Sequence, residues 1–243
     1  MSEWFSEIKA KFILDFIEKQ RWMYITDGLR VTLEVTFLAL ILGLVLGALI
    51  AVIRTTHDQL KDESKKGLGG AILQVADTIC RAYLTVIRGT PTMVQLLLMF
   101  FVFLASSNNK VMVAVLTFGM NSGAYVAEIF RSGIMSIDKG QMEAGRSLGL
   151  SYVDTMGQII MPQAIKNCLP ALVNEMITLL KETSICGYIG LNELTRGGDI
   201  IRGVTYDALL PLLVVALIYL VIVMFFTWIM SRLERRLRES DIR

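Results

Sequence analysis

The chain has 243 residues, of which 54% are hydrophobic and only 19% are charged. Soluble globular domains carry about 25% charged residues, so this composition, with a mean hydropathy of +0.57, predicts an integral membrane protein. The net charge of +2 leaves 24 Lys and Arg against 22 Asp and Glu, which excludes a strongly basic nucleic-acid-binding protein and an acidic disordered chain. Cys80, Cys168 and Cys186 show no zinc-site or disulfide-framework spacing.

Residues 1–27 are predicted to form an amphipathic segment before the first span. Phe5, Ile8, Phe12 and Phe16 recur at helical spacing, and acidic and basic residues occupy the opposite face. This pattern favours a helix over 4–18 that lies on the membrane surface. The segment lacks the basic start and small-residue cleavage site of a signal peptide.

Five stretches have the length and apolar character expected of membrane spans, because a bilayer core of about 30 Å needs about 20 apolar residues in a helix. Four contain long intervals without Asp, Glu, Lys or Arg. The fourth in chain order contains Glu175, Lys181 and Glu182, so one side of it must face protein. Residues 71–87 carry separate apolar and polar stripes and are predicted to be interfacial; as a span they would raise the number to six. The predicted spans are 31–53, 89–108, 111–131, 167–189 and 208–230.

Two pairs of glycines recur at a spacing of four residues within the predicted spans. Gly43-x-x-x-Gly47 lies in the first span and Gly119-x-x-x-Gly123 in the third. Such pairs let helix backbones approach closely, so the first and third helices are expected to pack together.

The distribution of basic residues predicts the orientation of the chain. A tight hairpin at 108–110 joins the second and third spans, whereas residues 54–88 and 132–166 form long polar connections that share a side. With the N-terminus outside, fifteen Lys and Arg fall inside and eight outside. The positive-inside tendency therefore predicts an N-out/C-in, all-α polytopic membrane protein with five transmembrane helices. Its transmembrane domain covers 28–231, and 232–243 form a basic cytoplasmic tail.

The cytoplasmic loop at 132–166 carries local signals for two short helices. Asp138 can cap the first, with Gln141 three residues on, and Ser151 with Asp154 forms a second capping pair. Gly149 suits the left-handed position that ends a helix.

The same loop contains a gapped motif. It reads Glu143-Ala144-Gly145, three residues, Gly149, nine residues, Ile159, one residue, and Met161-Pro162. This motif resembles the EAA loop of ABC importer permeases, written EAA, x3, G, x9, I, x, L, P, with Gly145 in place of the second alanine and Met161 in place of leucine. Pro162 is expected to end the second short helix.

Further motifs extend this resemblance to the polar amino-acid subfamily of such permeases, over about residues 26–230. They are Arg88-Gly89-Thr90-Pro91 with Gln95, Tyr125-x-x-Glu128-x-x-Arg131-x-Gly133, Asn174-Glu175, and Lys181-x-Thr183-Ser184.

The resemblance implies one transmembrane subunit of a dimeric pore in the bacterial inner membrane, multi-pass and surrounded by lipid, with a second copy or a related permease as its partner. A solute-binding protein outside the cytoplasm would deliver an amino acid, and a dimeric ATP-binding subunit would hold ATP and Mg²⁺. The chain contains no GxxxxGK[ST] phosphate loop, so it is expected to be no enzyme and to hold no cofactor, metal or nucleic acid. The residues implied to contact the ATPase are Gln141, Glu143, Ala144, Gly145, Ser147, Leu148, Gly149 and Leu150.

Polar side chains recur at helical spacing on the third and fourth predicted spans. Such residues usually face a cavity or a protein partner, so the two stripes are expected to meet and form a small pocket for a zwitterion. The structural alternative for Glu128 is an ion pair with Arg131. The predicted pathway residues are Asn121, Tyr125 and Glu128 on the third span, and Asn174, Glu175, Thr178 and Glu182 on the fourth.

Two other functions are alternatives to an ATP-driven importer. A secondary transporter or channel would use Glu128, Glu175 and Glu182 to relay protons or cations, but no internal inverted repeat is present. A membrane scaffold or enzyme would leave the charged fourth span unexplained, and no catalytic constellation of side chains shares one side of the membrane. The identity of the amino acid and the choice between a homodimer and a heterodimer stay open.

Overall fold

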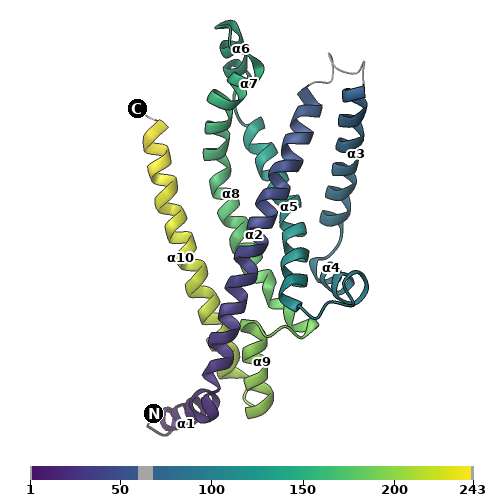
Figure 1. Cartoon of the computed structure of the whole chain (residues 1–243). Helices are drawn as coiled ribbons and strands as arrows, with labels where there is room; N and C mark the ends of the chain where they lie inside the picture. Colours follow the sequence, from purple (N-terminus) through teal and green to yellow (C-terminus); the bar gives the residue numbers. More distant parts are fainter. Residues whose placement is uncertain (1, 60–67, 242–243) are drawn as a thin grey trace. The chain divides into compact units, whose positions relative to one another are not determined.

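The computed structural model of the chain describes the backbone of residues 2–59 and 68–241, and the side chains of residue 4, residues 6–58 and residues 68–235. These residues form helices joined by short connections, and no strand is present among them (Figure 1). Phe5 of the predicted surface stripe and the basic residues of the tail beyond 235 lie outside the described side chains. The α-helices are α1 (Ser2–Phe12), α2 (Trp22–Gln59), α3 (Leu68–Gly89), α4 (Thr92–Leu98), α5 (Lys110–Met135), α6 (Lys139–Ser147), α7 (Tyr152–Thr155), α8 (Met161–Glu182), α9 (Leu194–Thr205) and α10 (Leu209–Asp241).

Shorter π-helical and 3₁₀ segments extend these helices. The π-helical segments are η1 (Ile13–Ile17), η3 (Met99–Phe103) and η4 (Met156–Ile160), and the 3₁₀ segments are η2 (Glu18–Gln20) and η5 (Thr183–Ile189). Among the described residues, four helices are long and apolar enough to cross a membrane: α2, α3, α5 and α10. α2 and α5 contain the predicted spans 31–53 and 111–131, and α10 contains the predicted span 208–230 except for its first residue.

The helix predicted over 89–108 is shorter in the structure, because it begins only after Pro91 and ends at Phe103. α3 ends at Gly89, because Pro91 lacks an N–H and disfavours the α conformation of the residue before it. α4 and η3 together contain only twelve residues, about 18 Å at 1.5 Å per residue. They are therefore too short to span the bilayer as a separate helix.

The interfacial interpretation of residues 71–87 is not confirmed, because α3 has the length and composition of a span. Its apolar stripe, which includes Ile72, Val75 and Ile79, is 60–64% exposed. Its other face packs Cys80 and Leu84 into a buried cluster with residues of α2 and α5. The amphipathic pattern of α3 thus reflects a helix with one face packed against protein.

Contacts divide the chain into two compact units, each assembled from separate segments. The first contains Met1–Ala39, Thr92–Phe118 and Ile177–Ile229, and the second contains Leu40–Pro91, Gly119–Met176 and Met230–Arg243.

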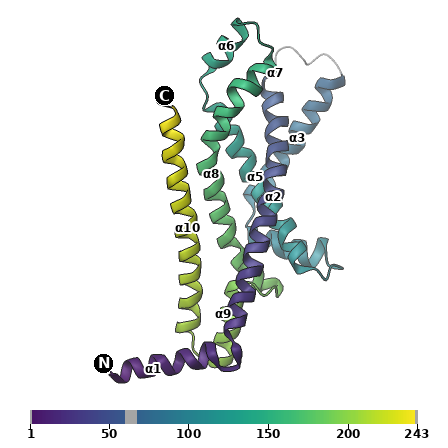
Figure 2. The same cartoon turned by 60° about the vertical axis from the view of Figure 1, so that its left-hand side comes forward.

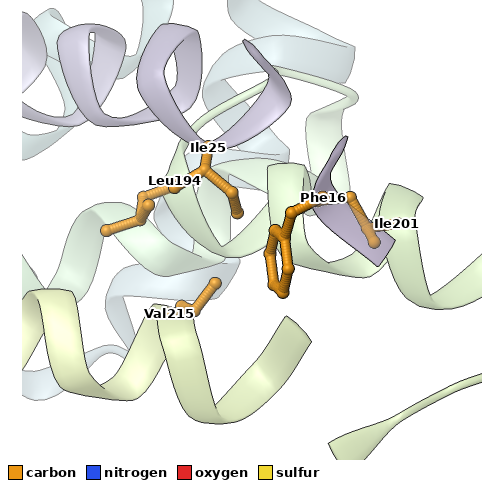
Figure 3. Close-up of a cluster of buried hydrophobic side chains, with 5 residues drawn as sticks. All are labelled: Phe16, Ile25, Leu194, Ile201 and Val215. Carbon is orange, nitrogen blue, oxygen red and sulfur yellow. The ribbon is translucent and has the colours of Figure 1, made fainter. Parts of the chain in front are cut away.

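The core of the first unit joins the N-terminal segment to two later helices. Phe16, Ile25, Leu194, Ile201 and Val215 form one buried cluster, in which side chains from η1, α2, α9 and α10 converge (Figure 3). Phe16 was predicted to face the membrane surface, but it is only 4% exposed because α9 and α10 pack over it.

The N-terminal segment turns sharply before α2. Lys19 and Gln20 have φ of 52° and 56°, a conformation that residues other than glycine rarely adopt. α1 therefore leaves the axis of α2 (Figure 2). Phe12 and Ile17 remain 46% and 56% exposed on this segment.

Close backbone contact joins α2 to α5 within the second unit, as the glycine spacing predicts. A Cβ atom at Gly47 would lie 2.5 Å from Val126 Cγ1, and one at Gly119 would lie 2.6 Å from Leu42 Cδ2. Neither glycine can gain a side chain without displacing the neighbouring helix.

Gly47→Ala is expected to destabilise the folded protein by about 1–3 kcal/mol, the usual cost of overpacking a close contact. Thermal unfolding of the purified protein measures the effect. Gly157→Ala is the matched control, because a Cβ atom at Gly157 meets nothing within 4 Å. Equal melting temperatures for the two variants would contradict the close packing of α2 on α5.

Candidate functional site

The predicted cytoplasmic loop folds into two capped helices. Asp138 caps α6 by accepting a hydrogen bond from Gly140 N at 2.6 Å, whereas the sequence pattern had assigned Gln141 as its partner. Ser151 caps α7 by accepting a hydrogen bond from Asp154 N at 3.1 Å, as predicted. Gly149 adopts a φ of 84° after α6, which confirms the left-handed turn.

The α6 helix is attached to the following helix through Gly145. A Cβ atom there would lie 2.5 Å from Thr155 Cγ2, so Gly145 is buried against α7. Leu150 is half-buried, and Leu148 is 83% exposed. The remaining residues predicted to contact the ATPase are also exposed: Gln141, Glu143, Ala144, Ser147 and Gly149. The exposed side of α6 therefore carries polar, small and apolar groups, and the opposite side is packed against α7.

The helix after this loop continues further than the sequence predicted. α7, η4 and α8 follow one another without interruption from Tyr152 to Glu182, so Pro162 does not end a helix. The π-helical turn of η4 directly precedes Pro162, and such turns accommodate a proline by relaxing the hydrogen-bond ladder. Pro170 lies inside α8 and not in its first turn. A continuous helix therefore runs from the loop into the predicted fourth span.

The polar residues of α8 divide into two groups. Asn174, Thr178 and Lys181 are exposed along one side of the helix. Glu175 is half-buried and lies near Ser122 on α5, whose buried hydroxyl has no hydrogen-bond partner within the described ranges. Glu182 is also half-buried.

The predicted pathway residues of α5 do not gather with those of α8 in one pocket. Tyr125 and Glu128 face α3: Arg88 Nη1 lies 2.9 Å from Glu128 Oε2 and its guanidinium lies 5.5 Å from the Tyr125 ring centroid. Asn121 is buried. The alternative pairing of Glu128 with Arg131 is also wrong, because Arg131 Nη2 lies 3.3 Å from Asp58 Oδ2.

α5 and α8 do pack together closer to the loop. A Cβ atom at Gly133 would lie 2.1 Å from Cys168 Sγ, and Asn167 Nδ2 donates a hydrogen bond to Ser136 Oγ at 2.9 Å. The two helices are therefore held together on the loop side of the Ser122–Glu175 contact, within the same unit.

Glu193 is a structural residue that the sequence pattern did not identify. Its buried carboxylate accepts hydrogen bonds from Thr195 N at 2.8 Å and Arg196 N at 2.7 Å, and from Tyr219 OH at 3.3 Å. Burial raises the pKa of this carboxyl, and the hydrogen bonds oppose that rise. Glu193 therefore caps the helix α9, which covers Leu194–Thr205. Glutamate is an uncommon capping residue, so sequence alone offered little signal.

No group of three or more His, Cys, Asp or Glu side chains in the described ranges could hold a metal ion.

Residues 68–239 match the family model described as the binding-protein-dependent transport system inner membrane component. The arginine transport system permease protein ArtQ of Bacillus subtilis (strain 168) is 37% identical over 221 residues, covering 90% of this chain and 94% of that protein. The glutamine transport system permease protein GlnP of Escherichia coli (strain K12) is 38% identical over 216 residues, covering 87% and 92%.

A solved structure is similar over nearly the same length. The crystal structure of an amino acid ABC transporter with histidines aligns with a TM-score of 0.78 and 39% sequence identity, covering 91% of this chain and 98% of that chain. The family model covers most of the chain, and both relatives align over almost their whole length. The chain therefore belongs to the family of inner membrane components of binding-protein-dependent transport systems.

Proposed function

We propose that the chain is the permease subunit of an ATP-driven importer of polar amino acids. The observation that carries the proposal is the α6 helix, which packs on α7 at Gly145 and exposes its other side after the EAA-type motif. Membership of the permease family supports it, as do relatives named for arginine and glutamine transport. The amino acid would be carried as a zwitterion along polar side chains of the spans.

The proposed topology has five crossings, with the N-terminus outside and the C-terminus inside. α3, α4 and η3 together form the second crossing, with the helix interrupted between Gly89 and Thr92. α8 with η5 forms the fourth. This assignment keeps the loop at 136–160 on the side with more Lys and Arg, in agreement with the positive-inside tendency.

A separate dimeric ATPase would bind ATP and Mg²⁺ and receive the exposed side of α6. Because Gly145 contacts Thr155 and the helix then continues through Glu182, movement of α6 would be transmitted along α8. Packed helices move as rigid bodies between discrete arrangements. ATP-driven movement of α6 would in this way reorient the polar stripe of α8.

The substrate pathway would run along the exposed side of α8. Asn174, Thr178 and Lys181 offer hydrogen-bond donors and acceptors and one cation to a zwitterion. A second permease, identical or related, would supply the opposite wall, and a solute-binding protein would deliver the amino acid from outside. Glu175 would act indirectly, by holding α8 against α5 beside Ser122.

Reconstitution with the ATPase and the binding protein tests the proposed function. Uptake of a polar amino acid into proteoliposomes is expected to require ATP and to be unaffected by collapse of ion gradients. Uptake driven by an ion gradient without nucleotide would contradict the proposal and favour the secondary-transporter alternative.

The turn at Gly149 offers a matched pair of variants for the same assay. Gly149→Val places a β-branched residue at a φ of 84°, which distorts the end of α6, so uptake should fall at least about tenfold because α6 no longer fits the ATPase. Gly149→Asn should retain most uptake, since asparagine tolerates the left-handed conformation. Equal uptake by both variants, in complexes shown by size exclusion to be assembled, would remove Gly149 from coupling.

A variant at Asn174 tests the pathway. Asn174→Ala should raise the half-saturating amino-acid concentration about fivefold, the effect of one lost hydrogen bond, without changing basal ATP hydrolysis. Ile165→Ala is the control, because nine residues place its exposed side chain on the opposite side of α8. An unchanged half-saturating concentration for Asn174→Ala would exclude this residue from the pathway.

A further inference from the structure

Three arginines converge on one polar cavity in the second unit. The cavity has a volume of about 550 Å³. Arg54 enters it from α2, Arg81 and Arg88 from α3, and Tyr125 and Glu128 from α5. The side chains of α6 and of the exposed α8 stripe do not line it.

The charges around this cavity do not cancel. Arg81 Nε lies 2.6 Å from Asp77 Oδ2, Arg54 Nε lies 3.6 Å from Asp77 Oδ1, and Arg88 pairs with Glu128. Three guanidinium groups therefore face two carboxylates, with His57 Nδ1 3.5 Å from Asp77 Oδ2 as a further donor when protonated. The cluster carries a net positive charge even with His57 neutral.

Arg54 also has an unused donor. Its Nε is buried and has no hydrogen-bond partner among the described residues, since Asp77 lies beyond hydrogen-bond distance. A buried donor of this kind is costly unless a further acceptor reaches it. Guanidinium groups are the side chains best suited to bind phosphate oxygens in pairs. The cavity therefore fits an oxyanion.

Two spans place the cavity at the edge of the hydrocarbon core. The charge-free stretch of α2 covers 35–53 and ends at Arg54, and that of α5 covers 111–127 and ends at Glu128. Both terminal charges line the cavity. In the proposed orientation these ends lie at the cytoplasmic leaflet, where lipid phosphates are found.

The cavity is open to the surroundings of α3 through two arginines. Arg81 and Arg88 have side chains that are 51% and 39% exposed. On the same helix, Ile79 and Val86 are 64% and 60% exposed. At 3.6 residues per turn, these apolar side chains lie on the side of α3 opposite Arg81 and Arg88. That side of α3 faces lipid, while the arginines line a basic pocket between helices of the kind that binds anionic headgroups.

We propose that this cavity binds the phosphate headgroup of an anionic phospholipid from the cytoplasmic leaflet. Arg54 and Arg81 bind the phosphate oxygens, and Arg88 stands at the rim, held by Glu128 and Tyr125. The acyl chains extend from the cavity into the hydrocarbon core. The proposal rests on the proposed orientation of the chain and does not depend on which solute is transported.

Lipid retention by the purified permease–ATPase complex tests the proposal. The complex is equilibrated with equal amounts of phosphatidylglycerol and phosphatidylcholine and analysed by native mass spectrometry. Wild type should retain phosphatidylglycerol in preference. Arg54→Gln/Arg81→Gln should lower that retention roughly twentyfold, since each arginine near the phosphate contributes about fivefold.

Arg131→Gln is the matched control. It removes one positive charge from the end of α5 that carries Glu128. Arg131 pairs with Asp58 and does not line the cavity. Its retention of phosphatidylglycerol should equal that of wild type. Equal loss in the control and in the double variant would overturn the site.

Measurements on wild type alone decide the source of the anion and do not depend on the folding of a variant. Millimolar inorganic phosphate, arginine or glutamine should leave the retained phosphatidylglycerol in place. Displacement by phosphate would identify a site for a soluble anion, and displacement by an amino acid a substrate subsite; either result would overturn the lipid proposal. Equal retention of the two lipids would also overturn it, and ATP-dependent uptake by the same complex would show that the proposed function stands independently.

Discussion

Helix backbones approach one another closely at small residues, and the arrangement of the second unit depends on this contact. Gly47 meets Val126, Gly133 meets Cys168, and Gly145 meets Thr155, each too closely for an added Cβ atom. Lipid is as apolar as leucine, so burial alone gives little attraction between helices in a membrane. Dispersion between surfaces in close contact then contributes most to packing. These contacts join α2 to α5, α5 to α8, and α6 to α7.

This packing explains how a short surface helix could act on a distant stripe. α6 has few residues of its own, but the Gly145 contact attaches it to a helix that continues from Tyr152 to Glu182. Tightly packed elements have few intermediate positions available to them. A push on α6 would therefore be passed along α8 instead of being absorbed in the loop.

Local signals predicted much of the loop, and partners distant in sequence were the main source of error. The helix ends at Gly149 and Ser151 depend on neighbouring residues, so they could be predicted, whereas the helix end expected at Pro162 is wrong because the preceding π-helical turn accommodates the proline. Arg88 pairs with Glu128 across forty residues, and no local pattern distinguishes that partner from Arg131. The apolar stripe of α3 suggested a surface helix because the sequence does not reveal that a different face, with Cys80 and Leu84, packs against α2 and α5.

The number of amino acids imported per ATP hydrolysed by a Gly145→Val complex tests most directly whether α6 acts through its contact with α7. The added side chain would separate α6 from Thr155 while leaving the exposed side of α6 unchanged. ATP hydrolysis is expected to continue while the transport ratio falls several-fold, and adding Thr155→Ala is expected to restore part of the ratio by making room. An unchanged ratio in the Gly145→Val complex would contradict the claim that α6 acts through its contact with α7.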